Sequence, residues 1–204
     1  TGYSTAINKG HSLGTNQTMI FYKIAGAGES ATLTVTSTAG NGGGLEILEF
    51  SGIDAVPLDK TNSDEVTDGT SVATGSTGTL TIADQVAVVV QATGLTNGGT
   101  EAITDSFSIV DTASFDRYIM AYKIVAATTA LNPTFSWATL RKAVATIATF
   151  ESAPSTTTST SSSTSTTKST STSSTTTSSS TSTTKSTSTS ITQSTSTSST
   201  TTSS

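Results

Sequence analysis

Short runs in which apolar and polar residues alternate recur along the first 154 residues of the chain. Clear examples are 31–38 (ATLTVTST), 45–52 (LEILEFSG) and 144–152 (VATIATFES), with Gly, Asn, Asp or Pro around them. An alternation with period two is typical of β-strands that bury one face. A continuous apolar run at 86–94 (VAVVVQATG) indicates a strand covered on both faces. Because helical spacing is weak throughout, the pattern predicts an all-β fold.

The turns between these runs narrow the fold class. Clusters of Gly and Asn at 39–44 (AGNGGG) and 96–100 (TNGGT) supply the positive φ angles that tight turns need. Many short strands joined by such turns are typical of two packed sheets. We therefore expect residues 1–153 to form a two-sheet antiparallel β-sandwich of the jelly-roll or immunoglobulin-like kind.

A shift by one hundred residues superposes two parts of this body. The tripeptide YKI at 22–24 falls on YKI at 122–124, and Phe50 falls on Phe150. Equal spacing from YKI to the closing Phe favours an internal repeat over chance. We expect two repeat units, at about 1–52 and 80–152.

The second unit contains one predicted strand more than the first. Its strands are expected at 81–94, 106–110, 118–126, 133–139 and 143–150. The first unit has counterparts for the last four only, at 2–8, 18–26, 31–37 and 45–50. The counterpart of the remaining strand would lie upstream of Thr1. A vacant strand position exposes unpaired N–H and C=O groups, and a strand from another subunit is the known way to fill it.

Two segments are candidates for that inter-subunit strand. The region that follows residue 154 offers one large apolar anchor, Ile191. The N-terminal segment 1–10 offers Tyr3 and Ile7 instead. The sequence leaves both candidates open.

Composition changes sharply at Pro154, where a tail of residues 154–204 begins. Ser or Thr occupies 46 of the 50 positions from 155 onward, and the sequence at 161–173 returns at 178–190. Such a segment has almost no apolar surface to offset the entropy of ordering, so it does not fold alone. Fully extended it reaches on the order of 165 Å, against a radius of gyration of about 15 Å for the body. We expect it to be extended and O-glycosylated, as in mucin-like stalks, with candidate sites at Thr156, Thr157, Thr158, Thr166, Thr167, Thr175, Thr176, Thr177, Thr183 and Thr184.

Charge and cysteine content exclude several classes of partner. The chain has fourteen acidic residues, all in the body, and nine basic residues, of which Lys168 and Lys185 lie in the tail. The body is therefore acidic, which argues against a nucleic acid or an anionic membrane as partner. No run approaches the ~18 apolar residues of a membrane span. Cys is absent, so neither disulfides nor thiolate metal sites form. A chain that starts at Thr1 suggests a processed product.

Several stretches together resemble a known module. They are 18–37 (TMIFYKIAGAGESATLTVTS), 45–59 (LEILEFSGIDAVPLD), 118–127 (YIMAYKIVAA), 133–139 (PTFSWAT) and 146–152 (TIATFES). The combination is similar to a β-sandwich module that recurs in large bacterial and phage surface proteins, usually without assigned function. The family's motif after its fifth strand is matched by Phe50, Ser51, Gly52, Ile53, Asp54, Pro57, Leu58 and Asp59. Family copies usually begin with an apolar strand that is lacking here, which puts independent folding in doubt. The resemblance implies a surface or fibre role and carries no catalytic residues.

No stretch of the chain predicts catalysis, a cofactor or a metal site. His11 is the only histidine, and we expect it to be exposed in a loop. The acidic stretch 62–69 (NSDEVTDG) lacks the order of a calcium loop, so a solvated loop is expected. Trp137, Tyr118 and Tyr122 offer a sugar-binding platform, but core packing is the preferred interpretation. Asn16 begins a formal N-glycosylation sequon, NQT.

These observations together predict a non-enzymatic structural subunit of an extracellular filament or surface fibre. The subunit would polymerise with copies of itself through β-strand complementation, and its glycosylated tail would run along the fibre at a cell or virion surface. The alternatives are a carbohydrate-binding or adhesive module on a glycosylated stalk and a phage tail or head fibre protein.

Overall fold

The computed structural model describes residues 2–14, 16–30, 32–36, 44–94, 102–110 and 118–154, together with the backbone of residues 193 and 194. These residues form antiparallel β-structure and no helix, as the sequence predicts. The strands are β1 (Ser4–Gly10), β2 (Gln17–Tyr22), β3 (Glu49–Phe50), β4 (Ile53–Ala73), β5 (Gln85–Thr93), β6 (Ala102–Ile103), β7 (Ser108–Ile109), β8 (Tyr118–Val125), β9 (Thr134–Ser152) and β10 (Gln193–Ser194).

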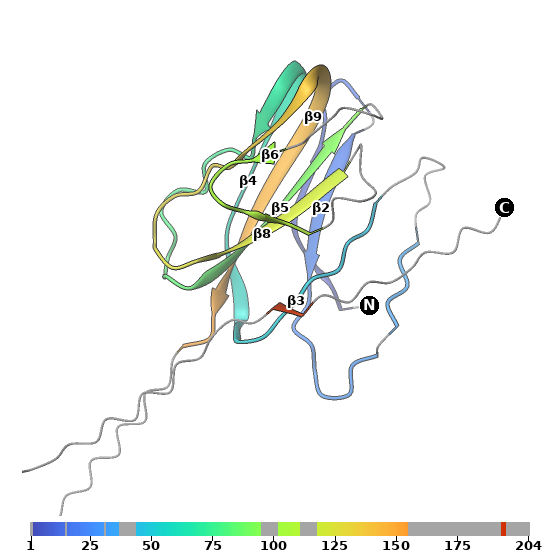
Figure 1. Cartoon of the computed structure of the whole chain (residues 1–204). Helices are drawn as coiled ribbons and strands as arrows, with labels where there is room; N and C mark the ends of the chain where they lie inside the picture. The colour runs from blue at the N-terminus through green and yellow to red at the C-terminus, as the bar shows by residue number, and fades with distance from the viewer. Residues whose placement is uncertain are drawn as a thin grey trace, which may run out of the picture.

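Six of these strands form the main sheet, in the order β4-β9-β5-β8-β7, with β6 also paired to β9 (Figure 1). The Val-rich strand β5 lies in the middle, paired with β8 on one side and β9 on the other. Eight of its nine residues are buried. This confirms the expectation of a strand covered on both faces, because a strand with only one covered face would alternate in burial.

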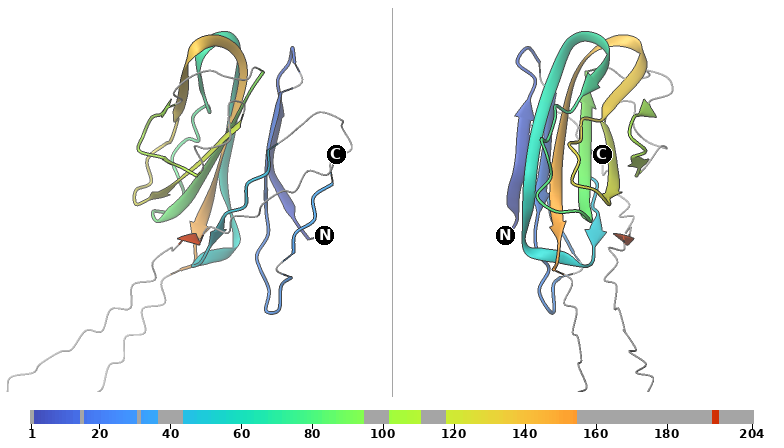
Figure 2. Two further views of the ribbon diagram at one scale, coloured as in Figure 1. Left: turned by 45° about the vertical axis from the view of Figure 1, so that its right-hand side comes forward. Right: turned by 90° about the vertical axis from the view of Figure 1, so that its left-hand side faces the viewer.

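Strands β4 and β9 form one long antiparallel pair that curls over one face of this sheet (Figure 2). Val72 pairs with Phe135 beyond the bend, and Asn62 pairs with Ile147 before it. The register shifts on both sides of Gly69, which pairs with Arg141. A Cβ at Gly69 would lie 2.7 Å from a Val66 methyl, so the bend requires glycine there.

The concave side of the bent β4–β9 pair encloses the first core. This core is a cluster of fourteen buried apolar residues among the described ones. Trp137 lies in it and is 5 % exposed. Its indole Nε1 donates to the Gly69 carbonyl at 3.0 Å. Segments 74–80 and 128–133 close this core, linked by backbone hydrogen bonds of 2.9–3.0 Å. The preference for core packing of Trp137 is therefore confirmed.

The opposite face of the main sheet carries the β1–β2 hairpin and the second core (Figure 2). β1 lies over β9 and β4, and β2 lies over β9 and β5. Segment 44–50 lies further along, over β8: Gly44 contacts the Tyr118 ring and Phe50 contacts Tyr122. Apart from β10, the described segments of this covering layer come from the first predicted repeat unit.

Three expectations about individual elements were wrong. The predicted acidic loop 62–69 belongs to the long strand β4, on which Asp64 and Asp68 are exposed and Glu65 is partly buried. The predicted strands at 133–139 and 143–150 are one continuous strand, β9. Residues 32–36, predicted as most of a strand, are exposed and belong to none of the strands. The alternating pattern of 32–36 is present, but a strand also needs a neighbouring strand with which to pair.

Candidate strand-accepting site

Among the described residues no strand lies between β2 and β3 in the covering layer, and we call this position the lane. In the described part of the chain β2 pairs only with β1, and β3 pairs only with the two residues of β10. β2 lies over β9 and β5 while Phe50 of β3 lies over β8, so the lane runs over the middle of the main sheet. Neighbouring strands lie about 4.8 Å apart, so a layer with one position unfilled leaves backbone edges on both sides.

Burial differs sharply between the two cores. Among described residues, the first core has fourteen buried members and three partly buried ones, whereas the second has five and ten. The partly buried members include Val90, Met120 and Tyr122, on β5 and β8 beneath the lane. Apolar side chains that remain half exposed over several strands mark a surface that another segment can cover.

Two aromatic contacts across the layers are related by the one-hundred-residue offset. The ring centroids of Tyr22 and Phe150 are 5.4 Å apart, at an interplanar angle of 58°. Those of Phe50 and Tyr122 are 5.7 Å apart, at 59°. Each Tyr thus contacts the Phe of the other unit, which is the reciprocity of a two-fold arrangement.

Strand pairing and lysine placement follow the same relation. Ser4 pairs with Tyr22 where β1 meets β2, and Ser108 pairs with Tyr122 where β7 meets β8. The Lys23 ammonium lies 5.8 Å from the Tyr3 ring centroid, and that of Lys123 lies 5.8 Å from the Phe107 centroid. β1 and β2 therefore correspond to β7 and β8.

The position of β10 matches that of β4 in this correspondence. Phe150 of β9 pairs antiparallel with Leu58 of β4 on one side and with Val86 of β5 on the other. Gln193 of β10 pairs antiparallel with Phe50 of β3 in the same chain. Figure 2 shows β10, in red, on the side of β3 away from β2, so it lies outside the lane.

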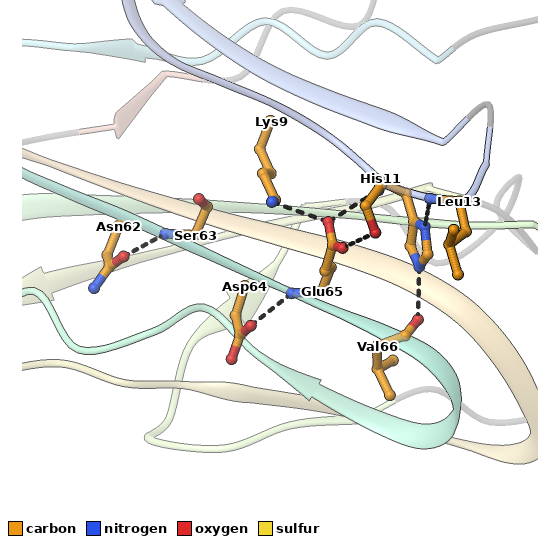
Figure 3. Close-up of polar contacts among 9 residues, drawn as sticks. Lys9, His11, Leu13, Asn62, Ser63, Asp64, Glu65 and Val66 are labelled. Carbon is orange, nitrogen blue, oxygen red and sulfur yellow. Dashed lines mark hydrogen bonds and ion pairs between the residues drawn. The ribbon is translucent and has the colours of Figure 1, made fainter.

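A polar cluster fixes the turn of the β1–β2 hairpin to β4 (Figure 3). Glu65 of β4 accepts hydrogen bonds from the hydroxyl and the backbone N–H of Ser12, the latter at 3.1 Å. The same carboxylate forms an ion pair with Lys9 at 2.9 Å. On the other side of the turn, Lys142 of β9 donates to the Leu13 carbonyl at 3.1 Å. The turn between β1 and β2 is therefore held in place by long-range polar contacts.

His11 lies inside this cluster, and the expectation that it is exposed was wrong. The side chain is 5 % exposed. Its Nε2 lies 3.0 Å from the Val66 carbonyl oxygen, and its Nδ1 accepts from the Leu13 N–H at 3.0 Å (Figure 3). This arrangement requires the neutral tautomer with the proton on Nε2. The buried imidazole thus links the turn to β4 through these two hydrogen bonds.

We expect acid to loosen the hairpin through Glu65. The bonds from Ser12 and Lys9 lower its pKa from 4.5 to about 2. A carboxyl with a depressed folded-state pKa stabilises fully above its unfolded pKa, and this contribution is lost as the pH falls from about 4.5 to about 2. The melting temperature of E65Q should therefore fall less between pH 5 and pH 3 than that of the wild type. The exposed change D68N alters charge equally and should leave the wild-type pH dependence intact; equal losses for E65Q and wild type would contradict the prediction.

The Pro57-Leu58-Asp59 part of the resemblance motif has a structural role. Leu58 packs in the second core, and Asp59 accepts from the Thr81 N–H at 2.9 Å and from Gln85 Nε2 at 2.7 Å. Burial alone would raise the pKa of Asp59, but these bonds and the Lys60 ammonium hold it well below its usual range. The carboxylate therefore ties the start of β5 to β4.

The candidate glycosylation and anchor residues fall in different places. Asn16 is half-buried, and its Nδ2, the atom that a glycan would occupy, donates to the Lys142 carbonyl at 3.1 Å. Ile7 packs in the second core of its own chain, and Tyr3 is 48 % exposed just before β1. Ile191 and all ten candidate threonines of the tail lie outside the described residues.

The described residues gather no catalytic constellation. They contain no group of three or more His, Asp or Glu placed to hold a metal ion. Trp137 lies in the first core and Tyr122 in the second, so the three aromatic residues do not form one platform. The described residues include no helix with the length and apolar character needed to cross a membrane.

Comparisons of the chain with protein-family models, with curated proteins and with solved structures found no match.

Proposed function

We propose that the protein is the structural subunit of an extracellular filament or surface fibre, and that its copies join by β-strand complementation. The observation that carries this proposal is the lane, an unfilled strand position above a half-covered core. Filling it satisfies the backbone groups of β2 and β3 and covers Val90, Met120 and Tyr122. The contact is heterologous, so it propagates as an open helix wherever its rotation does not close a ring.

The body in this proposal is a two-sheet sandwich built from two equivalent units. The exchanged pairs Tyr22–Phe150 and Phe50–Tyr122 and the matching pairings of Ser4 and Ser108 support it. One unit is complete because β5 fills its middle. The other lacks the equivalent strand and is the acceptor.

The tail follows the fibre in this proposal and carries O-linked sugars. Its hydroxyl density and the absence of Gly, Pro, Asn and Asp after Pro154 favour an extended, accessible chain. The carbohydrate-binding alternative loses its main support, since Trp137 is buried and bonded to Gly69. A surface fibre role also agrees with the resemblance to bacterial and phage surface modules.

Electron microscopy and mass spectrometry of the same secreted preparation test the proposal. Concentrated protein should form filaments with a fixed axial repeat under negative stain. Dispersed particles at every concentration would show that the subunit does not polymerise. The intact mass should exceed the 20.5 kDa of the polypeptide. A mass equal to that of the polypeptide would remove the glycans from the proposal and leave polymerisation standing.

A further inference from the structure

The main sheet has two outer strands, and they differ greatly in length. β7, at one edge, has two residues. β4, at the other edge, has 21 residues and pairs only with β9 in the described part of the chain. A long outer strand presents unpaired N–H and C=O groups to any extended segment of a second copy. An open β4 edge would therefore compete with the lane for strands of other copies.

The regular part of the β4 edge is short. The register with β9 is unbroken over residues 61–66, and register shifts lie on both sides of this stretch. Such bulges bend a strand and interrupt its backbone pairing, so the irregular parts of β4 are poor templates for an added strand. The unbroken pairing at 71–73 covers three residues. A second copy that added to β4 would have to pair along 61–66.

The direction of the backbone groups in this stretch follows from the neighbouring strand β9. The Gly94 N–H, at the end of β5, donates to the Lys142 carbonyl of β9 at 3.1 Å, so Lys142 faces β5. Successive residues of an antiparallel strand direct their backbone groups to opposite sides. Ala145, three residues further along, therefore faces β4, where it pairs with Asp64. The two residues that flank Asp64 then direct their N–H groups to the free edge.

Side chains of β4 itself accept from these two N–H groups. The Ser63 N–H donates to Asn62 Oδ1, and the Glu65 N–H donates to Asp64 Oδ1, both at 2.8 Å (Figure 3). Each acceptor belongs to the residue just before the N–H, so the bond is local and forms with the strand. An N–H that is already bonded in this way is less available to the carbonyl of an added strand.

β2, which borders the lane, has neither form of protection. Its sequence, QTMIFY, contains no charged residue. In the part of the chain that the structure describes, no side chain accepts from a backbone N–H of β2. The β4 stretch 61–66 instead contains Asp64 and Glu65 as well as the two bonded N–H groups. The two edges thus differ in both charge and free backbone donors.

We propose that Asn62 and Asp64 close the β4 edge to strands of a second copy and so direct strand addition to the lane. This inference goes beyond the proposed function, because the closed edge keeps copies from associating through β4 whether or not they polymerise elsewhere. The side-chain acceptors have a specific consequence: their loss should matter more than an equal loss of charge nearby.

The full-length double variant N62A/D64A, which lacks both acceptors, tests the proposal. Its matched control is N62A/D68A, which loses the same charge and the same Asn62 Nδ2 bond to the Ser76 carbonyl but keeps Asp64. Asp68 is exposed, as Asp64 is, and lies outside the regular stretch. Sedimentation velocity at concentrations where the wild type is monomeric measures association. Trp137 fluorescence checks that each variant is folded.

We expect N62A/D64A to associate at a concentration at least tenfold lower than N62A/D68A does. The further change T61K places a charge at an exposed position of the same stretch, and it should reverse this association. Equal association of the two double variants would show that the side-chain acceptors do not close the edge. Association that T61K left unchanged would lie on another surface and would also overturn the proposal.

The single variants D64A and D68A keep the proposal testable if the loss of Asn62 unfolds the body. Each removes one exposed charge, but only D64A releases the Glu65 N–H. D64A should associate at a concentration at least threefold lower than D68A does, and equal behaviour would overturn the proposal. These comparisons are made below the concentration at which filaments form. A wild-type chain without filaments would therefore contradict the proposed function and leave this inference standing.

Discussion

Removal of residues 188–204 should abolish filaments while leaving the body folded. This deletion takes away Ile191, the large apolar anchor that makes the tail a candidate inter-subunit strand, and leaves every described residue of both cores in place. Strand addition obtains most of its affinity from backbone hydrogen bonds. A subunit without a donor strand therefore loses the whole contact with its neighbour. Sedimentation and negative-stain microscopy at the wild-type filament-forming concentration measure the effect.

A deletion of equal length elsewhere in the tail provides the control. Residues 161–177 form one complete 17-residue period, and their loss leaves the segment that begins at residue 178 unchanged. The shorter chain keeps 20 residues between the body and Ile191, a span of up to about 70 Å. It should still polymerise, since that span exceeds one body. Persistence of filaments after deletion of 188–204 would show that the donor lies elsewhere.

Alanine at Phe150 and at Phe50 should have very different effects, although the two residues occupy equivalent positions. Phe150 is 8 % exposed, with β5 paired beside it, so F150A should cost about 3–5 kcal/mol of folding free energy. Phe50 is half-buried at the edge of the lane, so F50A should cost the dilute monomer only about 1 kcal/mol. The same change removes an acceptor contact and should raise the concentration needed for filaments at least tenfold.

Urea unfolding followed by fluorescence separates these effects. Trp137 is the only tryptophan, and it lies in the first core, away from both substitutions. Dilute full-length protein keeps polymerisation out of the unfolding curve. If F50A destabilised the monomer as much as F150A, the lane would already be filled in the free subunit. If F50A formed filaments at the wild-type concentration, Phe50 would not belong to the acceptor.

The sequence predicted most of the strands because their information is local. Alternation identified β1, β2 and β8, and the Val run identified β5. The same alternation at 32–36 did not produce a strand, since pairing depends on a neighbour that local pattern does not specify. β4 was missed between 62 and 69 because its Asn, Ser, Asp and Glu residues are also typical of a solvated loop.

The candidate site was only partly predictable. The one-hundred-residue offset predicted a unit one strand short, and in the described part of the chain β2 pairs only with β1. The polar cluster at the turn could not be predicted from the sequence, because its members join the β1–β2 hairpin to a strand more than fifty residues away. Its members are Lys9, His11, Ser12 and Glu65. Polar contacts of that range depend on the completed packing, so the burial of His11 emerged only with the fold.

The separation of acceptor and donor gives any polymer of this subunit two chemically different ends. The terminal subunit at one end exposes the uncovered edges of β2 and β3, and the subunit at the other end trails an unused tail. A body that has lost its tail can still receive a donor but offers none to the next subunit. Proteolytic trimming of the tail would therefore produce chain terminators that limit fibre length.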